Sequence, residues 1–199
     1  MFPNWQGKAL VLDSTYDLPS NQNVSIDVLK FYVSGLTLLQ DDDIVFREDN
    51  SFHLMDAAIP ESFKINFLIG EIKKFNKIRF QLGIDSLTNI SGAMGGDLDP
   101  TKGMYWTWQS GYINLKLEGK SSLCSTRNKA FVFHLGGYLN HFNACKTIEL
   151  PIVNLNDSIS VNFDVSSLIS FINLASQNHI MSPSVDAMRL TGLVANHIK

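Results

Sequence analysis

The stretch "IRFQLGI", residues 78–84, alternates between apolar and polar side chains. Its even-numbered residues are apolar, and Arg79 and Gln81 stand between them. Strict alternation is typical of a strand with one face toward a core and one toward water, as in antiparallel sheets. The pattern recurs in "INLKLE" (113–118) and "ISVNFDV" (159–165). The sequence therefore predicts a protein built mainly of antiparallel strands.

Other apolar segments extend this pattern over most of the chain. Further strands are expected at residues 8–16, 24–39, 51–56, 61–69, 130–135 and 147–153. The strand at 24–39 is expected to break near Gly35, because glycine weakens a strand interior. Turn-like sequences such as "QDDD" (40–43) separate several of these segments.

Helical periodicity is found near the end of the chain. Residues 164–177 have apolar side chains at helical spacing after a serine cap. At 182–199, Ser182 is expected to cap a helix that has Pro183 in its first position. Its buried stripe is expected to comprise Val185, Met188, Leu193 and Val194. Strands followed by short helices predict an all-β fold, an antiparallel β-sandwich (Greek-key, Ig- or cupredoxin-like) with a short C-terminal helical segment, in one domain over 1–199.

Composition and charge exclude several classes of protein. Of 199 residues, 45% are hydrophobic and 18% charged, which permits a sizeable core. The net charge of −3, without a basic stripe, argues against nucleic-acid binding. No apolar run reaches the roughly 20 residues of a transmembrane helix, and no signal sequence is recognisable. A bridge between Cys124 and Cys145 would suit an exported protein, with two unpaired thiols as the alternative.

Residues 85–104, "DSLTNISGAMGGDLDPTKGM", are expected to form a long loop. Loops of this length in compact domains are usually functional or disordered. Asp85, Asp97 and Asp99 could supply oxygen ligands to calcium, although the complete calcium-loop pattern is missing. A solvated acidic loop is the alternative.

The stretch "GMYWTWQSGY" (103–112) follows that loop. An unbroken strand would place Trp106 and Trp108 on the polar face, with Lys116. A bulge at Gly111 would instead turn both rings into the core. The sequence leaves both arrangements open.

Histidines are the strongest candidate metal ligands, because neutral imidazole is the commonest one in proteins. His134 and His53 lie opposite apolar neighbours in predicted strands. His179 and Met181 offer soft ligands of the kind copper uses, but they precede the expected helix cap, which favours a helix junction. No Gly-x-Ser-x-Gly elbow or nucleotide-binding glycine loop occurs, so we expect a protein that is not an enzyme.

Several segments together resemble one known family. They are "VLKFYVSGLTL" (28–38), "SFHLMD" (51–56), "IRFQLGID" (78–85), "DLDPTKGMYWTWQSGYINLKLEG" (97–119), "FVFHLGG" (131–137) and "IMSPSVDAM" (180–188). The chain resembles the MbnP family, copper-associated proteins of the bacterial periplasm or cell surface. Many members sit beside MauG-type di-haem enzymes, and some accompany methanobactin.

The resemblance implies a periplasmic, cell-surface or secreted protein that binds copper without catalysing a reaction and acts with a di-haem partner related to MauG and cytochrome c peroxidase. In related copper proteins, a tryptophan oxidised to kynurenine joins histidines at the metal. Carried over, Trp106 or Trp108 is the candidate for oxidation, with His134 and then His53 as candidate ligands. Trp108 stands where the related W-x-H arrangement has histidine. The alternative is a carbohydrate- or protein-binding module that uses the Trp106/Trp108 face.

Overall fold

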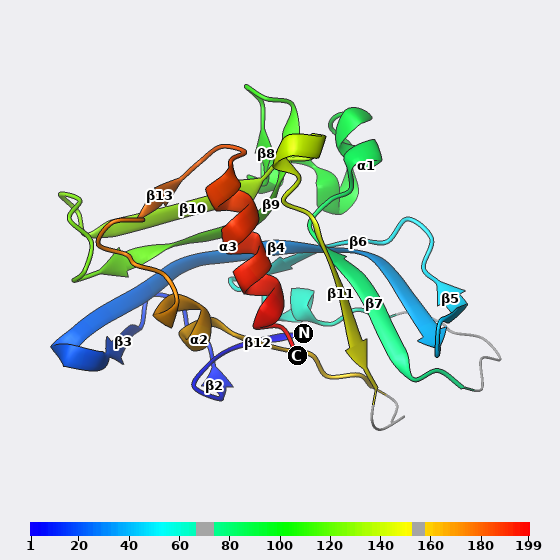
Figure 1. Ribbon diagram of the computed structural model, residues 1–199, viewed down its shortest axis with the longest axis horizontal. Helices are drawn as coiled ribbons and strands as arrows, with labels where there is room; N and C mark the ends of the chain where they lie inside the picture. The colour runs from blue at the N-terminus through cyan, green and yellow to red at the C-terminus, as the bar shows by residue number, and fades with distance from the viewer. Residues whose placement is uncertain (67–73, 153–157) are drawn as a thin grey trace.

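The computed structural model describes residues 1–66, 74–152 and 158–199. Within these ranges the regular secondary structure is mostly strand, arranged in two sheets (Figure 1). The smaller sheet consists of β1 (Phe2–Trp5), β2 (Lys8–Ala9) and β12 (Asn162–Asp164). The larger sheet of ten strands consists of β3 (Thr15–Leu18), β4 (Gln22–Gln40), β5 (Asp43–Arg47), β6 (Phe52–Asp56), β7 (Lys77–Leu82), β8 (Tyr105–Trp106), β9 (Gly111–Ser121), β10 (Ala130–Gly136), β11 (Lys146–Pro151) and β13 (His179–Ile180).

Strand β4, which is 19 residues long, is the spine of the larger sheet. Phe31 pairs with both β6 and β9, whereas Val33 pairs with both β6 and β7, so β9 and β7 follow one another along the edge opposite β6. The sheet divides there into a first wing, β9–β10–β13, and a second wing, β7–β11 (Figure 1). The predicted break at Gly35 is instead a bulge, where this glycine has a φ of 60° and β4 continues.

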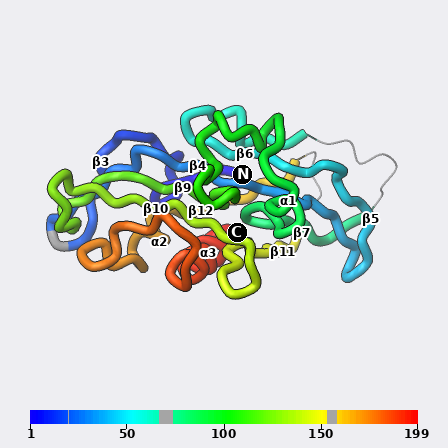
Figure 2. Tube along the Cα trace, turned by 90° about the horizontal axis from the view of Figure 1, so that it is seen from above, coloured from blue at the N-terminus to red at the C-terminus, as the bar shows by residue number. Residues whose placement is uncertain are grey.

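One face of the larger sheet, here called the inner face, carries the main core. Phe31, Phe133 and Leu135 on this face are fully buried. They pack with apolar side chains of α2 (Val165–Ser170) and α3 (Val185–Asn196), which run along one side of the molecule while β6 lies along the other (Figure 2). The Phe31 ring meets Phe163 of the smaller sheet edge-on at 5.7 Å between centroids. The predicted all-β sandwich with a short C-terminal helix is therefore confirmed.

The opposite, outer face carries a second, smaller core. It forms where residues 85–112 fold over Tyr32 of β4 and Leu54 of β6. This segment is a set of short turns, because α1 (Ser86–Ile90) and the 3₁₀ turns Gly96–Leu98 and Pro100–Lys102 interrupt the predicted loop. The Tyr32 hydroxyl donates to the Asp97 carbonyl at 3.0 Å. The long segment is thus fastened to the sheet as a cover.

Several predicted boundaries are wrong. Pro60–Phe63 is a 3₁₀ turn rather than the start of a strand, and residues 67–69 lie outside the described residues, as does residue 153. Of the stretch 159–165, Asn162–Asp164 forms a strand. This strand ends at Asp164 because α2 begins at Val165. The predicted 164–177 helix is shorter, and its cap is Asp164 rather than a serine. Of the stripe predicted for α3, Val185 is exposed; the buried residues of the helix are Ala187, Leu190, Thr191 and Val194.

The side chains that cap α2 and α3 contribute to the stability of the fold. Ser184, not Ser182, caps α3, and Asp164 caps α2 by accepting from the Ser167 amide at 3.1 Å. We expect Asp164→Ala to lower the free energy of unfolding by about 1 kcal/mol, because three donors, the Ser166 hydroxyl and the Ser167 amide and hydroxyl, lose their acceptor. Urea unfolding measures this, and Asp49→Ala in an exposed turn is the control. Equal stabilities of the two variants would contradict the capping role.

Candidate functional site

The two predicted site tryptophans lie on a tight hairpin. Strand β8 pairs with the start of β9, with Tyr105 opposite Tyr112 and Trp106 opposite Gly111. Residues 107–110 form the turn, and Ser110 adopts a φ of 51°. The chain therefore reverses direction between Trp106 and Gly111, with Trp108 in the turn itself. Neither the unbroken strand nor the bulge at Gly111 is what forms here.

Trp106 is a core residue and is 5% exposed. Its ring packs in the outer-face core and lies against Gly136 of β10, where a Cβ would approach the ring Cζ3 atom to 2.7 Å. Its indole Nε1 is buried without a hydrogen-bond partner in the part of the chain that the structure describes. A buried unpaired donor costs free energy, so this nitrogen is an unusual feature of the core.

Trp108 is 65% exposed and packs on Trp106 with 5.8 Å between ring centroids. The core arrangement is confirmed for Trp106 and is wrong for Trp108. The pair therefore does not form a flat platform of two exposed rings. Instead, the exposed Trp108 ring at the surface contacts the Trp106 ring, which is buried in the outer-face core.

His134 lies on the outer face of β10, and alternation places its side chain on the same face as Gly136 and thus as the Trp106 ring. The residue is 8% exposed. Its Nε2 lies 2.6 Å from Oε1 of Glu118. Burial lowers the pKa of His134 below its usual value, although the Glu118 carboxylate opposes the shift. The neutral form of the imidazole, which metal ligation requires, is therefore favoured.

His53 lies elsewhere. It pairs with Val33, so its side chain belongs to the inner-face side of β6, at the sheet edge. Its Nε2 lies 2.8 Å from Oε2 of Glu48, which also accepts from Ser51. The two predicted metal ligands, His134 and His53, therefore face opposite sides of the sheet and do not form one site.

The structure adds two residues to the surroundings of His134. Glu118 is on the neighbouring strand, and His179 of β13 pairs in parallel with Val132, two residues from His134. Lys116, which pairs with His134 across the strands, also lowers the pKa of His134, and the proximity of His179 contributes in the same direction. Alternation in "INLKLE" already placed Glu118 on the polar face. The two-residue strand β13 gives no periodic signal, so sequence reasoning could not bring His179 here.

The carboxylates of residues 85–104 have separate structural partners. Asp85 caps α1 by accepting from the Thr88 amide, and Asp99 accepts from Thr101. Asp97 accepts from the Leu54 amide at 2.9 Å and from Lys102 at 2.6 Å. Within the ranges that the structure covers, no three His, Cys, Asp or Glu side chains form a group that could hold a metal ion.

The cysteines are unpaired, so the possible disulfide between them does not form. Cys124 is buried, and burial raises the pKa of Cys145 to about 12. At neutral pH that thiol is protonated, which makes it unreactive. The described helices include none long and apolar enough to span a membrane.

Comparisons with known proteins agree on one family. The family model MbnP matches residues 1–182. Among solved structures, the chain is similar to MbnP from Methylosinus trichosporium, with a TM-score of 0.59 and 12% sequence identity, over 94% of this chain and 80% of that one. No curated protein matches the sequence. A family match over nearly the whole chain, joined to the same fold, leads to one conclusion: this chain belongs to the MbnP family.

Proposed function

We propose that the chain is an extracytoplasmic copper-binding protein, not an enzyme, whose site lies on the outer face at His134 and Trp106. One observation carries the proposal. The buried Trp106 ring lies over the sheet face that presents His134, and exposed Trp108 packs on that ring. The proposed ligand His134, the buried Trp106 and the exposed Trp108 thus lie on the same side of the first wing.

His134 has the environment of a metal-binding histidine. Glu118 holds Nε2, and Nδ1 has no hydrogen-bond partner among the described residues. A carboxylate on the second ring nitrogen is the usual arrangement for a metal-bound imidazole, since it fixes the orientation of the ring. Imidazole is a good ligand for copper. Nδ1 of His134 is therefore the proposed ligand atom, and the prediction of His53 as a second ligand is not carried forward.

Copper would need ligands in addition to His134. Among the described residues, no group of three His, Cys, Asp or Glu side chains could supply them, so another kind of ligand is needed. The family resemblance supplies one candidate, a tryptophan oxidation product. The unpaired Nε1 of Trp106 supports this choice. Cleavage of the indole C2–C3 bond by two equivalents of hydrogen peroxide, with release of two water molecules, followed by hydrolytic loss of C2 as formate, would leave that nitrogen as an aromatic amine. Trp108 is exposed and in contact with Trp106, which suits oxidation by a di-haem partner that docks from outside.

Titration of the purified protein with Cu(I) and Cu(II) tests the metal proposal. His134→Ala is expected to weaken copper binding by at least about tenfold, because the only proposed imidazole ligand is removed. His53→Ala, which removes a histidine from the other side of the sheet, is the matched control and is expected to bind copper as the unsubstituted protein does. Weak, unsaturable binding by the unsubstituted protein, or unchanged binding by His134→Ala, would overturn the site.

Mass spectrometry tests the partner proposal separately. After incubation with a di-haem peroxidase-like protein and hydrogen peroxide, the peptide that carries both tryptophans is expected to gain mass. Trp106→Phe is expected to abolish the modification of residue 106, whereas His53→Ala is expected to leave it unchanged. Sugar-dependent quenching of fluorescence that is lost in Trp108→Ala would instead support the carbohydrate-binding alternative.

A further inference from the structure

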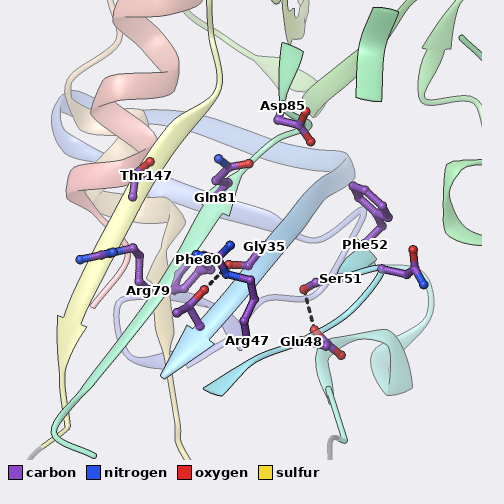
Figure 3. Close-up of a pocket in the computed structure, with 12 residues that line it drawn as sticks. Gly35, Arg47, Glu48, Ser51, Phe52, Arg79, Phe80, Gln81, Asp85 and Thr147 are labelled. Carbon is purple, nitrogen blue, oxygen red and sulfur yellow. Dashed lines mark hydrogen bonds between the residues drawn. The ribbon is translucent and has the colours of Figure 1, made fainter. Parts of the chain in front are cut away.

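A groove of about 440 Å³ lies on the outer face of the second wing, away from the proposed copper site. Phe52 and Asp85 stand at one end of it, and Arg47 and Arg79 at the other (Figure 3). The bulge at Gly35 forms part of the wall. The groove is thus a product of the bend at which β4 passes from one wing to the other.

The register of the strands brings two arginines to this groove. Thr37 of β4 pairs with Arg47 of β5 on one side and with Arg79 of β7 on the other. Residues paired in this way share a face of the sheet, so the two guanidinium groups flank Thr37. Thr37 stands between the two arginines, so neither is the direct cross-strand partner of the other.

Of these two arginines, Arg79 alone has an ion-pair partner among the residues that the structure describes. Arg79 donates from Nε and from a terminal nitrogen to the Glu149 carboxylate, at 2.8 and 2.6 Å. Arg47 is exposed, and no hydrogen bond or ion pair to it occurs among the described residues. An uncompensated guanidinium is therefore present in the groove.

The acidic side chains at the groove are already engaged. Glu48 accepts from Ser51 at 2.5 Å and lies 2.8 Å from the His53 ring nitrogen. Asp85 accepts from the Thr88 amide and hydroxyl as the cap of α1. Neither carboxylate forms an ion pair with Arg47 among the described residues, so the guanidinium keeps its N–H donors for a ligand.

We propose that this groove binds an oxyanion, a carboxylate or phosphate group of a small molecule, with Arg47 as its direct contact. A guanidinium presents parallel N–H donors that match either group in a two-pronged contact. Gln81 and Thr147 line the same groove and offer further donors. This site is independent of copper, because it lies on the other wing and contains neither His134 nor Trp106.

Titration calorimetry with inorganic phosphate and, separately, with succinate tests the proposal at low ionic strength. Saturable binding of either anion is expected, and the anion that saturates identifies the group. Arg47→Met is expected to lower the affinity by at least about tenfold. Arg127→Met, which removes an exposed arginine from a turn beyond β9, is the matched control and is expected to bind as the unsubstituted protein does.

Glu149→Gln gives a second, opposite measurement. Releasing Arg79 from its carboxylate adds a second free guanidinium beside Thr37, so the affinity for the anion is expected to rise severalfold. Failure of both anions to saturate the unsubstituted protein would overturn the inference. Equal affinity of Arg47→Met and the unsubstituted protein would also overturn it, whatever the copper titration shows.

Discussion

Gly119→Ala is expected to lower the free energy of unfolding by about 3 kcal/mol or more, since overpacking at a backbone contact cannot be relieved by a side-chain rotation. Gly119 lies in β9 between β4 and β10. A Cβ at this position would lie 2.0 Å from the backbone oxygen of Ser25 and 2.7 Å from the Phe131 ring. The paired strands β4 and β9 would have to separate around Gly119. Urea unfolding followed by circular dichroism measures the loss.

Gly192→Ala is the matched control, with the opposite expected sign. Gly192 lies within α3, and nothing lies within 4 Å of the Cβ that the substitution adds. Alanine favours a helix interior over glycine by roughly 0.5–1 kcal/mol, so this variant is expected to be more stable than the unsubstituted protein. Comparable stability changes for the two alanine variants would contradict the packing described for β9.

Trp106→Ala is expected to cost about 3–5 kcal/mol, the range for removing a large aromatic side chain from a core. Trp106 fills the space between Gly136 and the outer-face core, and its loss leaves a cavity there. Trp108→Ala, two residues away, is expected to change stability by no more than about 0.5 kcal/mol, because its side chain is mostly exposed.

The same two variants separate folding from function. Thermal and urea unfolding give their stabilities, and intrinsic fluorescence reports which ring is buried. An equal loss of stability in both variants would show that Trp108 is also a core residue. A loss of less than about 1 kcal/mol in Trp106→Ala would show that the outer-face core does not depend on this ring.

Alternation was sufficient to predict the strands that have one wet face. The stretch 78–84 became β7, which ends at Leu82, and the stretch 113–118 became the middle of β9. Phe80, Leu82, Leu115 and Leu117 face the main core together as predicted, whereas Ile84 and Ile113 belong to the outer-face core, Ile113 because the register shifts there. The pattern failed where tertiary contacts decide the structure. Residues 159–165 alternate equally well, yet Asp164 caps a helix, because its carboxylate accepts from the amide and hydroxyl groups that follow it.

The candidate site was only partly predictable for a related reason. The alternation of side chains along β10 predicted that His134 lies on the face opposite Phe133 and Leu135, and the structure agrees. Parity along the stretch 103–112 failed, because the chain turns at 107–110 and resumes on a second strand. Which histidines share a face depends on how β6, β10 and β13 are ordered around β4. No local pattern carries that order, so the separation of His53 from His134 emerged only in three dimensions.

Strand β4 also has a consequence for how the chain assembles. It pairs with β3, β5, β6, β7 and β9, whose residues extend from Thr15 to Ser121. During synthesis, the edge that faces β9 lacks its partner until more than eighty further residues have left the ribosome. Non-local pairing of this kind slows folding, and unpaired strand edges favour aggregation. The pairing of β4 with β9 is therefore expected to be a late step in folding, and the unpaired edge of β4 is exposed to aggregation until it forms.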